Sequence, residues 1–91
     1  MSTNTWSWEY DPDREHVVGG VPAETVTEVE RLAGQLVELA AVGVDVADMG
    51  HGPRAGGLRR MDAAGGWFHF LVAPRMRLII IVKIVPPFGH P

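Results

Sequence analysis

The chain has 91 residues and a net charge of −3, with 46% hydrophobic and 21% charged residues. This length suits one domain over residues 1–91, and the balance of apolar and charged side chains excludes wholesale disorder. The absence of cysteine excludes a disulfide framework and any zinc site of the cysteine type, so we expect a cytoplasmic protein.

The N-terminal third predicts a strand followed by one or two helices. Residues 6–10, WSWEY, alternate aromatic and polar side chains, as in a strand with one buried face. Residues 13–20, DREHVVGG, are too short to require a helix. Residues 22–42 are predicted to be helical because apolar side chains recur at three- and four-residue steps between Pro22 and Gly43. Its expected buried positions are Val26, Val29, Leu32, Ala33, Leu36, Leu39 and Ala40.

The second half predicts a loop and a sheet. Residues 44–56 have no sustained period, so we expect a loop there, with room for one short helical turn. Three strand-like runs follow, GLRRM (57–61), WFHFLV (67–72) and RLIIIVKIV (77–85). Their short connectors predict a three-stranded antiparallel meander over residues 57–85, followed by a tail over residues 86–91. The fold class is therefore α+β, with the helix packed on one face of the sheet.

Alternation along residues 77–85 separates a core face from an open face. The face expected to receive the helix holds Leu78, Ile80, Val82 and Ile84. The opposite face would carry Arg77 and Lys83, which makes it basic. Arg60 of the first meander strand would join them, or Arg59 if the register differs by one residue.

The charges are divided unevenly along the chain. Residues 1–50 hold ten acidic and two basic side chains, a net charge of −8, whereas residues 51–91 hold six basic and one acidic side chain, a net charge of +5. Such a division lets one surface attract phosphate while another repels it. The alternative is internal neutralisation, with an acidic helix facing a basic sheet.

The segment GGLRRM…GGWFHFLVAPRMRLIIIVKIVPP resembles the C-terminal half of the RelE/ParE-type toxins of bacterial type II toxin–antitoxin systems. In that family an L-R motif opens one strand and an apolar strand follows a short hairpin. The N-terminal WEYDP and the helix introduced by Val-Pro are similar too, so the resemblance covers residues 6–87. It implies a small RelE-like fold whose exposed concave sheet face is the working surface. In the RelE branch that surface cuts messenger RNA at the ribosome without a metal.

The resemblance implies catalytic roles for Arg60, His69 and Lys83, although His69 stands where family members often carry an arginine. Cations would stabilise the phosphate charge during attack by a 2′-hydroxyl, and acid–base groups would move the protons. The expected RNA and phosphate contacts are Arg54, Arg59, Arg75 and Arg77. We expect no cofactor and no metal, because the four histidines, His16, His51, His69 and His90, lack ligand spacing.

The expected partners follow from the same resemblance. A toxin of this size implies a cognate antitoxin protein lying across the sheet and helix surfaces, and an active nuclease implies the ribosome and messenger RNA. We expect no membrane partner, because the apolar run of residues 78–82 is far shorter than the roughly 20 residues of a spanning helix. The missing Y-R motif keeps an alternative open, a ParE-like gyrase poison or an inactive partner-binding module of the same fold.

Overall fold

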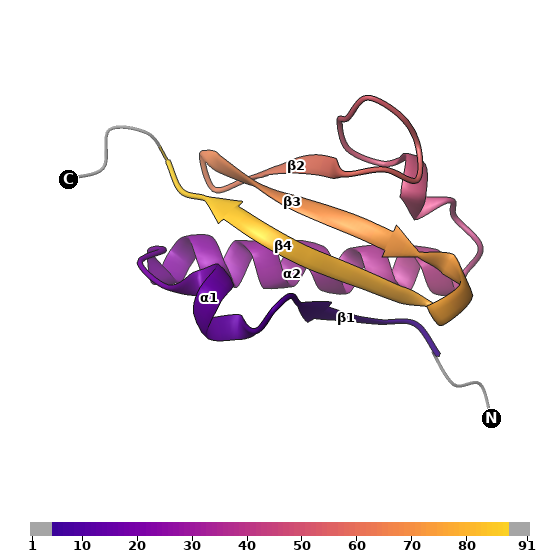
Figure 1. Ribbon diagram of the computed structural model, residues 1–91, viewed down its shortest axis with the longest axis horizontal. Coiled ribbons are helices and arrows are strands. Elements are labelled where there is room, and N and C mark those ends of the chain that lie inside the picture. The colour runs from indigo at the N-terminus through magenta and orange to yellow at the C-terminus, as the bar shows by residue number, and fades with distance from the viewer. Residues whose placement is uncertain (1–4, 88–91) are drawn as a thin grey trace.

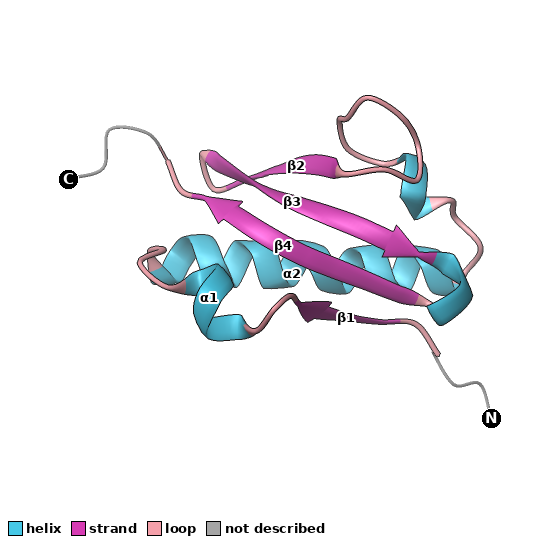
Figure 2. Ribbon diagram, in the orientation of Figure 1, coloured by secondary structure: helices cyan, strands magenta, loops and turns pink. Residues whose placement is uncertain are grey.

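The computed structural model describes residues 5–87, in which a four-stranded sheet is covered on one face by a long helix (Figure 1). The strands are β1 (Ser7–Tyr10), β2 (Arg59–Ala63), β3 (Gly66–Ala73) and β4 (Leu78–Val85). Their order in the sheet is β1-β4-β3-β2. The last three form the expected antiparallel meander, and β1 joins β4 in parallel, so the sheet is mixed (Figure 2). The α+β class is confirmed.

Both helices have terminal signals that the sequence supplies. The short helix α1 (Arg14–Val18) begins after Asp13, whose carboxylate accepts a hydrogen bond from the His16 amide at 2.8 Å. The long helix α2 (Ala23–Ala41) differs from the expected residues 22–42 by one residue at each end. At its C-terminus Gly43 has a φ of 96°, and the Val44 amide donates to the Leu39 carbonyl at 3.0 Å. This Schellman arrangement explains why the helix stops there.

The core lies between α2 and the face of the sheet behind which α2 runs in Figure 1. Its largest fully buried side chains include Phe68 and Phe70 of β3 and Ile79 and Ile81 of β4. The helix contributes Val29, Ala33, Leu36, Val37 and Ala40. Within residues 5–87, neither helix has the length and hydropathy that crossing a membrane requires.

A β-bulge in β4 makes the predicted face of that strand wrong for Ile80 and Val82. Ile81 lies opposite Phe70, but Lys83 lies opposite His69, so Val82 is an extra residue in β4. Before the bulge the odd positions face the helix, and after it the even position Ile84 does. Ile80 and Val82 are instead only partly buried. Alternation alone misplaced them because both faces of this strand are apolar.

The strand bounds also differ at β2. This strand begins two residues later than expected and extends to Ala63, because the β2–β3 turn consists of Ala64 and Gly65 alone. Both turn residues have positive φ, 50° and 84°, as a two-residue type I′ hairpin requires. Arg77 lies before β4, in a left-handed conformation that ends a turn of 3-10 helix, η2 (Pro74–Met76). It therefore does not belong to the strand that was expected to present it.

Candidate functional site

Four side chains form a row across the open face of the sheet, the face that α2 does not cover. Arg60 of β2 pairs with His69 of β3, and His69 pairs with Lys83 of β4. On the outer edge of β2, His51 forms an isolated antiparallel bridge with Arg60. Residues directly opposite one another on neighbouring strands share a face, with Cβ atoms about 5 Å apart. We call His51, Arg60, His69 and Lys83 the cross-strand row.

The register of β2 places Arg60 in this row and turns Arg59 to the opposite face. Arg59 is only 6% exposed, and its guanidinium donates hydrogen bonds to three carbonyls of the preceding loop. The nitrogen–oxygen distances are 2.9 Å to Met49, 3.0 Å to Gly50 and 3.2 Å to Asp48. Arg59 therefore holds the loop against β2. Its guanidinium donates its hydrogen bonds to carbonyls of the protein itself, which gives Arg59 a structural role.

Two glycines allow His51 to approach β2 this closely. The His51 amide donates to the Arg60 carbonyl at 2.8 Å, and the Arg60 amide donates to the His51 carbonyl at 2.7 Å. At Gly50, where φ is 75°, a Cβ would lie 2.5 Å from the Arg60 carbonyl oxygen, and at Gly52 it would lie 2.5 Å from that of Leu58. From the sequence alone, His51 is noted only as one of four histidines that lack ligand spacing. The available signal was a histidine between two glycines in a loop next to a strand.

His69 is held in one protonation state by its neighbours. The indole Nε1–H of Trp67 donates to Nε2 of His69 at 3.2 Å. Because that indole nitrogen can only donate, Nε2 must be unprotonated and the ring proton must lie on Nδ1. Partial burial, and then the charges of Lys83 and Arg60, lower the pKa of His69 below its ordinary value of 6.5. At neutral pH His69 is therefore a neutral imidazole that offers Nδ1–H as a donor.

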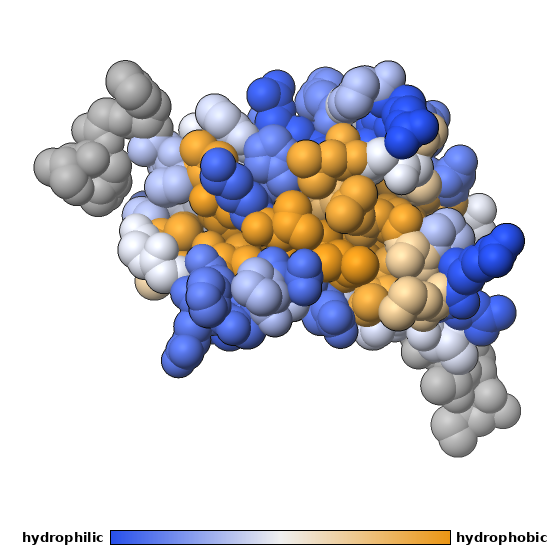
Figure 3. Space-filling view, viewed as in Figure 1, coloured by the Kyte–Doolittle hydropathy of each residue, from blue (hydrophilic) through white to orange (hydrophobic). Residues whose placement is uncertain are grey.

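The cross-strand row borders an aromatic and an apolar surface. The guanidinium carbon of Arg60 lies 5.3 Å from the centroid of the Trp67 ring, within cation–π range. Leu71 and Ile80, which pair across β3 and β4, share the open face with the row. Figure 3 shows the resulting apolar patch in the middle of this face, with hydrophilic side chains around it. The open face therefore combines two cations, two imidazoles and apolar area.

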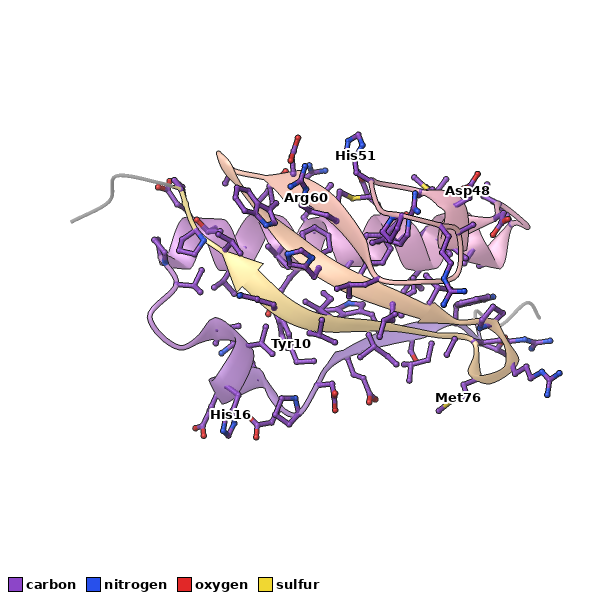
Figure 4. The ribbon with its side chains drawn as sticks, turned by 45° about the horizontal axis from the view of Figure 1, so that its top comes forward. Tyr10, His16, Asp48, His51, Arg60 and Met76 are labelled. Atoms are coloured by element: carbon purple, nitrogen blue, oxygen red, sulfur yellow. The ribbon has the colours of Figure 1, made fainter. Side chains whose placement is uncertain are left out.

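A hollow of about 390 Å³ lies at the β2 end of the cross-strand row. Figure 4 shows His51 and Arg60 projecting close together at that edge of the sheet. Leu58, which is 44% exposed, contributes an apolar wall. The lining residues are His51, Gly52, Pro53, Leu58, Arg60 and His69.

The remaining predicted cations lie elsewhere. Arg75 is in η2 and Arg77 follows it, at the end of the β3–β4 hairpin far from His69. The Nη1 of Arg77 donates to Oγ1 of Thr5 at 2.8 Å. Arg54 is exposed in the loop before β2. The structure thus brings together Arg60, His69 and Lys83 and does not add Arg54, Arg59, Arg75 or Arg77 to them. His90, which the metal argument considered, lies outside the described residues.

Within the part of the chain that the structure describes, ion pairs do not neutralise the basic half. Arg14 pairs with Glu30 at 3.5 Å and Arg31 pairs with Glu28 at 2.6 Å, so the pairs of the acidic half are internal to it. Across residues 5–87, no salt bridge joins an acidic side chain of the first fifty residues to a cation beyond them. In the same range no three His, Asp or Glu side chains are grouped as a metal site requires. The cations of the open face remain available to an external anion.

Comparisons with protein-family models, with curated proteins and with solved structures gave no match to this chain. The cross-strand row and the hollow beside it are therefore the features that indicate a function.

Proposed function

We propose that the open face of the sheet binds RNA and that the protein is a metal-independent endoribonuclease of the RelE type, the toxin of a type II toxin–antitoxin pair. The observation that carries the proposal is the cross-strand row, in which two cations and two imidazoles lie side by side on an exposed surface. Cleavage of RNA by its own 2′-hydroxyl needs positive charge at the phosphate and groups that move two protons. Side chains in the row offer both.

Each member of the row has a role in this reaction. Arg60 and the Nδ1–H of His69, in the middle of the row, bind the non-bridging oxygens of the phosphate. His51, at one end, accepts the proton of the 2′-hydroxyl as its oxygen attacks phosphorus. Lys83, at the other end, protonates the 5′-oxygen as the bond between phosphorus and that oxygen breaks. The products are a 2′,3′-cyclic phosphate and a free 5′-hydroxyl.

A cell-free translation reaction with purified protein tests this proposal. Messenger RNA ends are mapped for the wild type, for Arg60→Ala and for the control Arg75→Ala, which removes an exposed arginine at the far end of the hairpin. New ends that disappear with Arg60→Ala and persist with Arg75→Ala are the expected result. Intact messenger RNA in the presence of the wild-type protein would refute the nuclease.

A second candidate function uses the same face without chemistry. It is favoured by the apolar patch around Leu71 and Ile80, which suits contact with a protein. The protein would then be a ParE-like gyrase poison or an inactive partner-binding module. Inhibition of gyrase supercoiling by protein that leaves messenger RNA intact would select the first of these, and the cognate antitoxin is a partner in every case.

A further inference from the structure

We infer that the hollow between His51–Pro53 and Leu58 is a binding site for one nucleobase, adjacent to the phosphate held at Arg60. The inference rests on the proposed function in that the ligand is RNA, and it adds recognition of a base to recognition of the backbone. It makes the loop before β2 part of the ligand-binding surface, with His51 at its centre.

The size of the hollow suits one nucleotide. Its volume of about 390 Å³ is near the lower end of the range of about 300 to 1,000 Å³ for pockets that hold small organic ligands. A base with its ribose is a ligand of that kind, whereas a folded partner would need a wider contact surface. The site is therefore matched to a single unit of a polymer that continues along the open face.

The chemistry of the walls suits a flat, polar ring. Pro53 and Leu58 provide apolar surface on which a base can pack, and the imidazoles of His51 and His69 complete the lining. Arg60 offers further guanidinium donors, and a nucleobase carries carbonyl and ring-nitrogen acceptors on its edges. The positive charges of Arg60 and Lys83 select an anionic ligand, so a nucleotide fits better than a neutral one.

Hydrogen bonds within the chain fix the loop wall of the hollow. Its loop wall is fixed to β2 by the two hydrogen bonds between His51 and Arg60 and by the three that Arg59 donates to the carbonyls of Asp48, Met49 and Gly50. Its other wall consists of Leu58, directly before β2, and of the strand residues Arg60 and His69. A preformed site loses little conformational freedom on binding, which favours measurable affinity for even one nucleotide.

The test measures binding of the four 5′-ribonucleoside monophosphates, with ribose 5-phosphate as the ligand that lacks a base. Affinity and the imidazole NMR signals of His51 and His69 are recorded for the wild type, for Leu58→Ala and for the control Met76→Ala. Leu58 is 44% and Met76 68% exposed, so both variants should fold. Stacking of one base changes affinity by roughly five- to a hundredfold. We expect at least one monophosphate to bind more tightly than ribose 5-phosphate by such a factor.

Leu58→Ala should abolish that advantage without changing the affinity for ribose 5-phosphate, and Met76→Ala should change neither. Equal binding of all these ligands, or an unchanged base advantage in Leu58→Ala, would overturn the inference. An acidic peptide that shifts the same imidazole signals at lower concentration than any nucleotide would also overturn it. Base-dependent binding by protein that leaves messenger RNA intact would support the site while refuting the nuclease. Cleavage of messenger RNA by protein that binds no monophosphate more tightly than ribose 5-phosphate would support the nuclease and refute the base-binding site.

Discussion

Arg59 and Arg60 have opposite roles because adjacent residues of a strand point to opposite faces of the sheet. Arg59 is buried and donates to three loop carbonyls, whereas Arg60 stands on the open face over the ring of Trp67. The first arginine stabilises the loop that carries His51. The second presents its guanidinium on the open face, where the proposed function places a phosphate, so one step of register separates a structural residue from a proposed binding residue.

Replacement of each arginine by methionine tests this division. Arg59→Met leaves the carbonyls of Met49, Gly50 and Asp48 without their donor, and we expect the free energy of unfolding to fall by about 2 to 4 kcal/mol. Arg60→Met removes only a cation–π contact at the surface and should cost less than about 1 kcal/mol. Urea unfolding of the two variants measures the difference. Similar losses for both would contradict the assignment.

His69 should make stability depend on pH. Its pKa is lower in the folded protein than the ordinary value of 6.5, so between these two values the unfolded chain binds more protons than the native one. The free energy of unfolding therefore falls as the pH is lowered through about 6.5. His69→Gln keeps an acceptor for Trp67 but cannot titrate. We expect the wild type to lose more stability than this variant between about pH 7.5 and about pH 5.5. Equal losses in urea unfolding would show that His69 titrates as in an unfolded chain.

At the scale of single elements, the bulge in β4 decides which apolar side chains support the core and which remain on the open face. It lets Ile81 and Ile84 both point toward α2, although they are three residues apart. It also sets Lys83 opposite His69, which completes the cross-strand row. One extra residue thus serves packing and the candidate site together.

Matched substitutions on either side of β4 test this geometry. Ile81 is fully buried, so Ile81→Thr loses apolar burial and places a hydroxyl in the core; we expect a loss of about 2 to 4 kcal/mol in the free energy of unfolding. Ile80→Thr makes the same chemical change on the open face and should cost less than about 1 kcal/mol. Thermal or urea unfolding compares the two. A larger loss for Ile80→Thr would favour the face assignment that simple alternation predicts.

The helix and the strands differ in how much of their structure could be predicted from the sequence. The helix was predictable because α2 has one apolar and one charged face and ends at a glycine that accepts positive φ. The buried face of β4 could not be predicted, because a strand with apolar residues on both faces shows no alternation that tells the two faces apart. The β-bulge also has no recognisable pattern in the local sequence. Arg60 and Lys83 could be predicted for the open face from alternation, whereas the half-buried His69 was a candidate through the family resemblance alone. The position of His51 depends on a bridge between the loop and β2, a tertiary contact that periodicity does not report.

In the whole molecule, the acidic and basic halves of the sequence form different parts of the structure. The acidic half supplies β1, α1 and α2, where Arg14 and Arg31 are paired within the same half. The basic half supplies three of the four strands and the loop beside them. Because the protein carries a net charge of −3, its overall charge repels a polyanion. The proposed binding of RNA therefore depends on local cations on the open face.

Attraction of RNA by local cations predicts a specific salt dependence of binding. For single strands, the logarithm of the binding constant falls with the logarithm of salt concentration by about 0.7 per neutralised phosphate. Arg60→Met removes one contact and should reduce that slope by about 0.7. Arg14→Met removes the same charge from a residue paired with Glu30 and should leave the slope unchanged. Titration of labelled RNA between about 0.05 and 0.2 M salt measures both slopes. If Arg14→Met lowers the slope as much as Arg60→Met does, the attraction comes from the charge of the whole protein and the cross-strand row has no special role in it.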